Sequence, residues 1–339
     1  MRGGARPGPW LLGLALALLG PAGCGGDEGG PVVDAAATVV DAAAGGDGGA
    51  SAGDGGGGDG ALGADAALVG CGCATFTAPA SVGRVMGAGA ELSGIAASRK
   101  HRGLLYVHND DPISGDTNLY VIDERAAVVG TITLTGAQAN NLEDLAVGPC
   151  GGGAPGSCVF VGNIGDNAGN ASEHQIHRFT EPDVVIGPTT LTPITLRYDY
   201  PGGAHPDAES LVVDPAGEIY VLTKVAGRSE VFHVPASAPL PPLTRVTALR
   251  VGELALPAGQ VATGADLAPC GARLLLRTYG GLHEWRAATP GWPALLAAPR
   301  GTLPVATEAQ GEAVGWTGSG GYATISEGAS PHLNLSACQ

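Results

Sequence analysis

The sequence is poor in basic and aromatic residues. Its 339 residues include 17 lysines and arginines against 32 aspartates and glutamates, a net charge of −15, and aromatic side chains make up 4%. From about residue 69 onward 24 acidic and 15 basic residues remain, a net charge of −9. Nucleic-acid-binding surfaces neutralise phosphates with Lys and Arg, so this charge excludes a general nucleic-acid partner and disfavours an anionic membrane face.

The sequence also lacks the short motifs by which many enzymes are identified. It contains no Gly-x-Ser-x-Gly elbow, no HExxH, no phosphate-binding P-loop and no dinucleotide glycine fingerprint. Its histidines show no metal-ligand spacing. Beyond residue 19 no apolar run is long enough to span a bilayer. A local motif therefore assigns no reaction to this chain.

The first 23 residues have the pattern of an export signal. Arg2 and Arg6 precede an apolar run over residues 10–19, and small residues follow up to Cys24. The Ala-Gly-Cys ending resembles the bacterial lipobox, which predicts lipidation of Cys24 and anchoring to the cell envelope, at the outer membrane or cell surface. Pro21 departs from that pattern, and ordinary secretion with Cys24 in a disulfide is the alternative.

Residues 24–69 are predicted to form a disordered tether that follows the lipidated Cys24. From residue 25 to 68 the chain consists almost entirely of Gly, Ala, Asp and Val, with eight acidic residues and no aromatic, Lys or Arg. Such a composition buries too little apolar surface to offset the entropy of ordering. A flexible segment of this length spans roughly 35–40 Å, enough to hold residues 70–339 clear of a membrane.

Residues 70–339 contain five segments that begin alike and are each followed by a turn and an aliphatic strand. The segments start at Ser93, Glu143, Glu209, Ala265 and Glu312. A period near 50 residues that is built from strands and turns, without a helical pattern, indicates the blades of a β-propeller. The fold class is therefore all-β, a single β-propeller, with five blades favoured and six as the alternative.

The last repeat lacks a clear fourth strand. Residues 80–86 can supply this strand and so close the ring, which hides the edges of the sheet. A closed ring of this kind is expected to be a monomer.

Six cysteines remain if Cys24 carries a lipid, and their even number suits disulfides in an exported protein. Cys150 and Cys158 bracket a short turn, so a local bridge is expected there. Cys338 is the penultimate residue of the sequence, and a bridge to Cys71 or Cys73 would join the two ends of the ring. Cys270 is then left with the other member of that early pair.

The topology of a blade gathers polar residues at one mouth of the central channel. The innermost strands start at that face and the second strands return to it. Ligand-binding residues are expected at this mouth, and the candidates are Asn109, Asp110, Asn163, Asp166, Asn167, Lys224 and Arg277. Asp144, Asp207, Asp266 and Glu327 are expected near them. The alternative for an Asn or Asp at a strand end is that its side chain caps a turn.

Three glutamates with the same position in their repeats are the candidate metal ligands. Glu143, Glu209 and Glu312 would project from three blades toward the channel axis, and like charges placed together require neutralisation. A cation that prefers oxygen ligands, Ca²⁺, is the natural guest. Lys224 and Arg277 nearby would suit an anionic substrate.

These repeats resemble a group of bacterial secreted propellers. The phrases that carry the resemblance are residues 141–146, 162–167, 207–211, 263–267 with 277–279, and 310–313 with 325–327. The last of them resembles the closing blade of the SdiA-regulated and phytase-like esterase propeller families. The resemblance covers about residues 90–330 and implies an exported propeller with an acidic channel mouth that holds Ca²⁺. It fixes no reaction, since related propellers include lactonases, phosphoesterases and binding modules.

Two functions follow from these observations. The first is a membrane-tethered propeller that binds a ligand or protein partner at the acidic mouth. The second is a Ca²⁺-dependent hydrolase of phosphoesters, esters or lactones, in which Lys224 or Arg277 holds the anion. No residue stands out as a general base with an orienting partner, which favours the binding function.

Overall fold

The computed structural model describes residues 71–110, 115–235 and 245–339, which all belong to the compact unit Asp59–Gln339. The expected signal peptide, the lipidation site Cys24 and the tether lie outside the described residues. No helix in the described ranges has the length and hydrophobicity that a membrane span requires.

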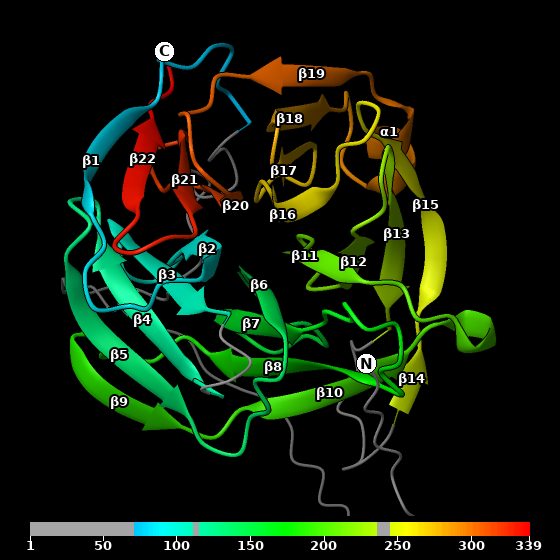
Figure 1. Ribbon diagram of the computed structural model, residues 1–339, viewed down its shortest axis with the longest axis horizontal. Helices are drawn as coiled ribbons and strands as arrows, with labels where there is room; N and C mark the ends of the chain where they lie inside the picture. Colours follow the sequence, from blue (N-terminus) through cyan, green and yellow to red (C-terminus); the bar gives the residue numbers. More distant parts are fainter. Residues whose placement is uncertain (1–70, 111–114, 236–244) are drawn as a thin grey trace, which may run out of the picture. The chain divides into compact units, whose positions relative to one another are not determined.

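In the described residues, five sheets that are antiparallel over their first four strands stand around a central axis as the blades of a propeller (Figure 1). The innermost strands are β2 (Leu92–Ala97), β6 (Leu142–Pro149), β11 (Ala208–Val213), β16 (Ala262–Leu267) and β20 (Gly311–Trp316). The second strands are β3 (Leu104–Asn109), β7 (Ser157–Asn163), β12 (Ile219–Thr223), β17 (Arg273–Thr278) and β21 (Tyr322–Ser326). The prediction of an all-β propeller with five blades is thus confirmed, and the six-blade alternative is excluded.

The outer parts of the blades are less regular. The third strands are β4 (Asn118–Asp123), β8 (His174–Thr180), β13 (Arg228–Val234), β18 (Gly281–Arg286) and β22 (His332–Ser336). The fourth strands are β5 (Val128–Leu134), β10 (Ile194–Asp199), β15 (Leu249–Ala255), β19 (Arg300–Leu303) and β1 (Ala80–Arg84). β9 (Gly187–Leu191) and β14 (Arg245–Thr247) add parallel fifth strands to the first two blades. A short helix, α1 (Trp292–Ala297), connects β18 to β19.

The ring is closed by the start of the folded chain. β1 pairs antiparallel with β22, as the sequence predicted, so one sheet contains both ends of the folded region. Cys73 and Cys338 form a disulfide pair with a Cα–Cα distance of 5.5 Å, and Cys71 pairs with Cys270 at 6.2 Å. Cys150 pairs with Cys158 at 4.8 Å, the expected local bridge.

The core lies between the blades. Five buried clusters each combine side chains from two neighbouring sheets. Alternate residues of a strand face opposite ways: Leu211 packs against the second blade, and Val212 packs against the fourth. Since both faces of every inner strand are buried, these strands are continuous aliphatic runs rather than alternating patterns.

A β-bulge interrupts the start of every innermost strand. The pairing register shifts around Ser93, Glu143, Glu209, Thr263 and Glu312. The fourth repeat therefore begins at Thr263, and the expected start at Ala265 is wrong by two residues. A bulge re-aims its side chain, so Glu143, Glu209 and Glu312 do occupy equivalent positions, with Ser93 and Thr263 as the corresponding residues of the other two blades.

Candidate functional site

The rim of the ring at which the innermost strands begin, here called the mouth, is lined by two sets of equivalent residues. Glu91, Asp207 and Gln310 stand two positions before the bulge residues. Their carbonyl groups accept hydrogen bonds from the backbone N–H of Asp110 (2.7 Å), Lys224 (2.8 Å) and Glu327 (3.0 Å), respectively. Each of these donors directly follows the second strand of its blade. Backbone pairing therefore brings both sets of side chains to one end of the ring.

Three carboxylates of the second and third blades form a tight cluster at the mouth. Ligand oxygens of Glu143, Asp207 and Glu209 all lie within 4.8 Å of one another. Glu143 and Glu209 are 3% and 4% exposed, and Asp207 is half-buried. Such a cluster could hold a metal ion, because it brings several oxygen ligands together and shields them from solvent.

The three members of this acidic cluster differ in their hydrogen bonding. Asp207 accepts a hydrogen bond from the backbone N–H of Asp166 (2.7 Å), and Glu209 forms an ion pair with Lys224. The Oε1 atom of Glu143 is buried and has no hydrogen-bond partner among the described residues. This oxygen lies against the backbone of Gly165, where a Cβ atom would collide with it. A glycine at position 165 thus leaves room for the Glu143 carboxylate.

Burial and mutual repulsion perturb the titration of these groups. Burial raises the pKa of Glu143 well above its usual range, and the negative charges of Asp110 and Glu209 raise it further. Burial also raises the pKa of Glu209 to about 8, although the Lys224 ammonium opposes this shift. Burial alone would lower the pKa of Lys224, but the Glu209 carboxylate raises it above its ordinary value. The cluster is therefore a place where positive charge is favoured.

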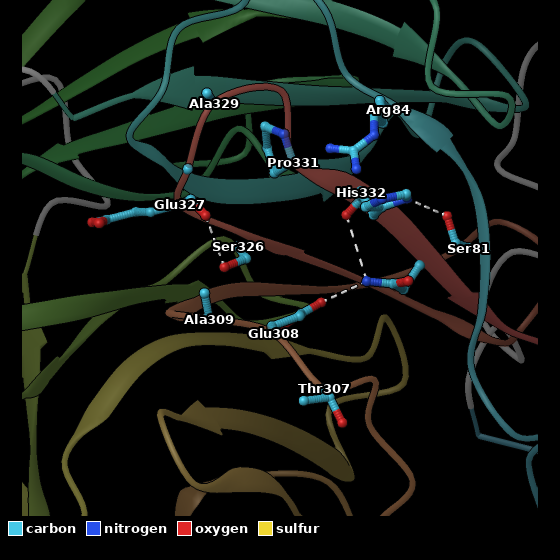
Figure 2. A pocket seen from close by; sticks show the side chains of 12 residues that line it. Ser81, Arg84, Thr307, Glu308, Ala309, Ser326, Glu327, Ala329, Pro331 and His332 are labelled. Atoms are coloured by element: carbon cyan, nitrogen blue, oxygen red, sulfur yellow. Dashed lines mark hydrogen bonds between the residues drawn. The ribbon is translucent and has the colours of Figure 1, made fainter.

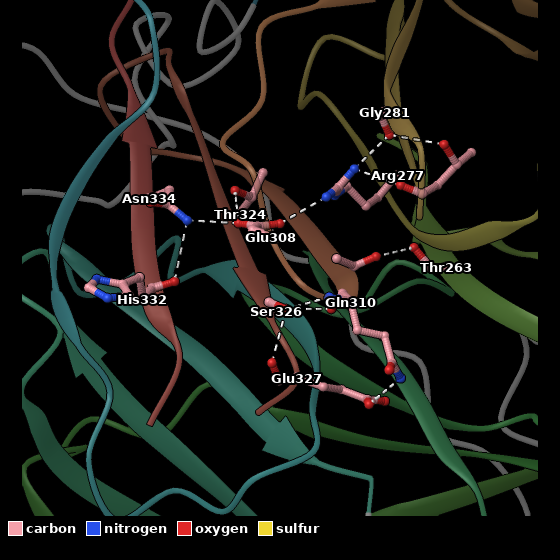
Figure 3. Close-up of polar contacts among 12 residues, drawn as sticks. Thr263, Arg277, Gly281, Glu308, Gln310, Thr324, Ser326, Glu327, His332 and Asn334 are labelled. Atoms are coloured by element: carbon pink, nitrogen blue, oxygen red, sulfur yellow. Dashed lines mark hydrogen bonds and ion pairs between the residues drawn. The ribbon is translucent and has the colours of Figure 1, made fainter. Parts of the chain in front are cut away.

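Glu312 belongs to a second acidic group on the fifth blade. Gln310 donates a hydrogen bond from Nε2 to Glu327 (Figure 3). The same nitrogen lies 3.4 Å from the Oε1 atom of Glu312. Burial, followed by the charge of Glu327, raises the pKa of Glu312 to about 7. Of the three glutamates expected to share a metal, Glu143 and Glu209 lie together with Asp207, and Glu312 is outside that group.

Most of the expected asparagines and aspartates of the mouth hold turns. The Oδ1 atom of Asn109 accepts the Glu91 N–H at 2.9 Å, and that of Asn163 accepts the N–H of Asn140 and Asn141 at 3.2 and 2.9 Å. The side chain of Asp166 accepts the backbone N–H groups of two residues, Asn170 and Ala171. Asn167 is exposed on the same turn. Asn109, Asn163 and Asp166 thus cap turns, which is the alternative to ligand binding stated for strand-end Asn and Asp residues.

Arg277 points away from the expected anion site. Its side chain is buried, donates to the carbonyl groups of Thr278 and Gly281, and pairs with Glu308 at 2.9 Å (Figure 3). The two-residue error in the fourth repeat explains this result: the residue equivalent to Lys224 is Tyr279, which follows the second strand as Lys224 does. Tyr279 is 44% exposed, and the Lys224 Nζ atom lies 5.6 Å from the centre of its ring.

Two other acidic residues expected near the mouth lie deeper along the axis. Asp144 is fully buried and accepts backbone hydrogen bonds from Leu145 (2.8 Å), Leu211 (2.9 Å) and Ala265 (3.2 Å). Asp266 accepts the N–H of Trp316 at 2.7 Å, where the innermost strands end. Each of these side chains accepts backbone hydrogen bonds from other blades and so connects them.

Asp207 and Tyr279 are the mouth residues that sequence reasoning did not select as site residues. Both positions carry a detectable signal. Asp207 stands two residues before a bulge glutamate, and polar residues hold the same place before three other bulges: Glu91, Asn141 and Gln310. Tyr279 is identified as the residue equivalent to Lys224 once the fourth repeat is aligned on Thr263.

A cavity of about 390 Å³ lies beside the mouth in the fifth blade (Figure 2). Its lining includes Ser81, Arg84, Glu308, Glu327 and His332. Glu308 is fully engaged there, since it accepts from Arg277, Thr324 and Asn334. No member of the acidic cluster lines this cavity, so the two features are separate.

No protein-family model and no curated protein sequence matches the chain. Solved structures that match the chain include the PQQ-bound aldose sugar dehydrogenase of Streptomyces coelicolor. It is 12% identical, with 78% of this chain and 98% of that chain covered and a TM-score of 0.45. A protein of unknown function from Bacteroides thetaiotaomicron is 11% identical (77% and 75% covered, TM-score 0.43). The Cps50 (Swd1) β-propeller domain of Myceliophteria thermophila is 12% identical (74% and 97% covered, TM-score 0.38). At such identities and TM-scores these likenesses say nothing about the activity of this chain, and the resemblance to the SdiA-regulated and phytase-like families stays a prediction.

Proposed function

We propose that this protein is an exported propeller that binds a ligand or protein partner at its mouth, around a Ca²⁺ ion held by the acidic cluster. The observation that carries the proposal is the buried Oε1 atom of Glu143, which has no hydrogen-bond partner in the described chain. A buried, unpaired carboxylate oxygen is costly unless a cation or a proton compensates it. The ligand oxygens of Glu143, Asp207 and Glu209 lie within 4.8 Å of one another, close enough for one cation to contact all three.

The spacing and the charge of the cluster support Ca²⁺. Ca–O distances are about 2.3–2.6 Å, so ligand oxygens on opposite sides of the ion stand up to about 5 Å apart. When all three carboxylates are ionised, they outweigh the Lys224 ammonium by two charges, which a divalent cation neutralises. Carboxylates without His or Cys favour Ca²⁺, Mg²⁺ or Mn²⁺ over softer metals.

Thermal unfolding of the full chain with and without Ca²⁺ tests this proposal. At a Ca²⁺ concentration of 100 times the Kd, binding to the folded state stabilises it by about 2.7 kcal/mol and raises the Tm. We expect this rise in the wild type, its loss in Glu143→Gln, and its retention in the control Glu253→Gln, which changes an exposed carboxylate of β15. Absence of a rise in the wild type at millimolar Ca²⁺ would overturn the metal site.

A second candidate function is hydrolysis of phosphoesters, esters or lactones. The specific observation in its favour is the Lys224 ammonium, which stands beside the acidic cluster and over the Tyr279 ring. A positive group at this place suits an anionic substrate. Turnover of model phosphoesters or lactones that requires Ca²⁺ and is lost in Glu143→Gln would establish an enzyme, and absence of turnover despite Ca²⁺ binding would leave the binding function.

We also propose that the protein is exported and attached to the cell envelope through a lipid on Cys24, with plain secretion as the alternative. The three cysteine pairs support export, since disulfides persist in oxidising compartments. Labelling with a radioactive fatty acid tests the anchor: the wild type should incorporate the label, and Cys24→Ser should not. A label-free wild type found in the medium would favour secretion.

A further inference from the structure

Lys224 is a largely buried lysine beside the acidic cluster. The sequence contains two lysines, Lys100 and Lys224. Lys100 pairs with Asp183 on the surface, whereas the side chain of Lys224 is 20% exposed and pairs with the buried Glu209 of the acidic cluster. Lys224 directly follows β12, at the mouth, and its Nζ atom lies 5.6 Å from the centre of the Tyr279 ring. A single ammonium group therefore stands between the carboxylates and an exposed aromatic side chain.

A cation held by the cluster must share Glu209 with this ammonium. The ligand oxygens of Glu209 and its two partners lie within 4.8 Å of one another, so an ion among them is close to the Lys224 Nζ atom. Two positive groups at this separation repel each other, most strongly where solvent is excluded. The repulsion weakens if an anion lies between them.

We infer that the mouth recognises an oxyanion, a phosphate or carboxylate group, that contacts both the bound cation and the Lys224 ammonium. This inference rests on the proposed function, because the cation supplies half of the attraction. Lys224 thus has two partners. It neutralises Glu209 while the cluster has no cation, and it holds the ligand's oxyanion once a cation is bound.

This arrangement has two consequences, and the second distinguishes it from a lysine that only neutralises Glu209. First, Lys224 competes with the cation for Glu209, so removing its charge strengthens cation binding in the absence of an anion. Second, an oxyanion and the cation strengthen each other's binding, and by thermodynamic linkage the effect is reciprocal. A lysine that turned to Glu312 instead would show the first effect without the second.

Calorimetric titration of the full chain with Ca²⁺ tests the inference, with and without 1 mM phenylphosphonate or acetate. We expect phenylphosphonate to tighten Ca²⁺ binding about 5- to 10-fold in the wild type, a magnitude typical of coupled sites. Lys224→Gln should bind Ca²⁺ more tightly than the wild type without anion and show no phenylphosphonate effect. The matched control is Lys100→Gln, which changes the other lysine and should behave as the wild type. Tightening by acetate would extend the ligand class to carboxylates, and tightening by phenylphosphonate alone would assign phosphate-like groups.

The failures of this experiment are separable. If the wild type binds Ca²⁺ but neither anion changes the affinity, or if the effect persists in Lys224→Gln, the oxyanion inference is overturned and the metal site stands. If no variant binds Ca²⁺, the proposed function falls and the inference with it. Lys224→Arg keeps the positive charge and should retain the coupling between phenylphosphonate and Ca²⁺. It therefore shows whether the loss expected in Lys224→Gln comes from the lost charge or from a misfolded variant. Loss of the coupling in a folded Lys224→Arg that still binds Ca²⁺ would count against the inference.

Discussion

The Asp144 side chain joins three blades through hydrogen bonds near the ring axis. Its carboxylate accepts the backbone N–H groups of Leu145, Leu211 and Ala265, which belong to the second, third and fourth blades. Removing the carboxylate leaves buried N–H donors without acceptors, at about 1–3 kcal/mol each before relaxation. We expect Asp144→Ala to lower the free energy of unfolding by about 3 kcal/mol or more, measured by urea titration.

A surface turn offers the control for this prediction. Asp123 also accepts two backbone N–H groups, from Arg125 and Ala127, but at an exposed turn where water can replace the carboxylate. Asp123→Ala should cost less than about 1 kcal/mol. Equal losses in the two variants would show that the inter-blade bonds of Asp144 contribute no more than a surface turn does.

The raised pKa values of the mouth predict how stability depends on pH. Burial raises the pKa of Glu209 to about 8 and that of Glu312 to about 7, from an ordinary value of 4.5. Between the ordinary and raised values the folded state binds more protons than the unfolded state, so the free energy of unfolding falls as pH rises. Without divalent cations these two glutamates therefore lower the free energy of unfolding as the pH rises from about 4.5 to 8, whereas His108, whose pKa burial lowers from 6.5 to about 4, contributes the opposite trend below pH 6.5.

Urea titrations in EDTA at several pH values measure this decline. Glu312→Gln removes one titrating group and should reduce the decline by on the order of 1–3 kcal/mol. Added Ca²⁺ should counteract the loss at high pH, where the carboxylates are ionised and bind cations best. A pH dependence of stability in EDTA that is the same in Glu312→Gln as in the wild type would contradict the assignment.

Residues of the mouth could be predicted where the repeats are alike and not where they differ. Glu143 and Glu209 share a position and a residue type, so the sequence places them at the same end of the ring. Thr263 occupies the same position without a carboxylate, and the alignment of its blade slipped to Ala265. This error of two residues also replaced Tyr279 by Arg277. The strands β16 and β17 are antiparallel, so moving two residues away from the mouth on β16 corresponds to moving two residues away from it on β17.

At the scale of the elements, burial decided which strands could be predicted. The two inner strands of each blade pack on both faces, which produces aliphatic runs that the sequence displays clearly. The outer strands are short or partly exposed, and β9 and β14 pair parallel to their neighbours across long connections. Such additions depend on where distant segments meet, so no local pattern marks them.

The glycine after each bulge residue, where present, allows close approach of the next blade. A Cβ atom on Gly264 would lie 2.5 Å from the carbonyl oxygen of Glu312, which belongs to the backbone and cannot move alone. We expect Gly264→Ala to cost about 1–3 kcal/mol of unfolding free energy by forcing the fourth and fifth blades apart. Gly318→Ala is the control, since a Cβ atom there has nothing within 4 Å. A Gly264→Ala variant as stable as the control would mean that the blades adjust without strain.

At the scale of the ring, the segment before β1 anchors the closure. Arg273 is buried against the rings of Phe76 and Trp316, 5.3 and 4.8 Å from their centres, and it donates to the Cys73 carbonyl. Phe76 belongs to the N-terminal segment and Trp316 ends β20, so the arginine joins the beginning of the folded chain to the fourth and fifth blades. The two disulfide pairs of Cys71 and Cys73 act on the same segment.

The closing disulfide should therefore stabilise the fold more than the local one. Cys73 and Cys338 are 265 residues apart, and Cys150 and Cys158 are 8 apart. In the chain-entropy account a cross-link stabilises by restricting the unfolded chain, and the effect grows with the logarithm of the loop length. Because the Cys71–Cys270 pair already shortens the free loop, we expect about 4 kcal/mol for the closing pair and about 2–3 kcal/mol for the local pair. Thermal and urea unfolding of Cys73→Ser/Cys338→Ser and Cys150→Ser/Cys158→Ser under oxidising conditions measures both. If removal of the local pair lowered the free energy of unfolding more, the ring would be held closed mainly by β1 pairing and the Arg273 contacts rather than by the Cys73–Cys338 disulfide.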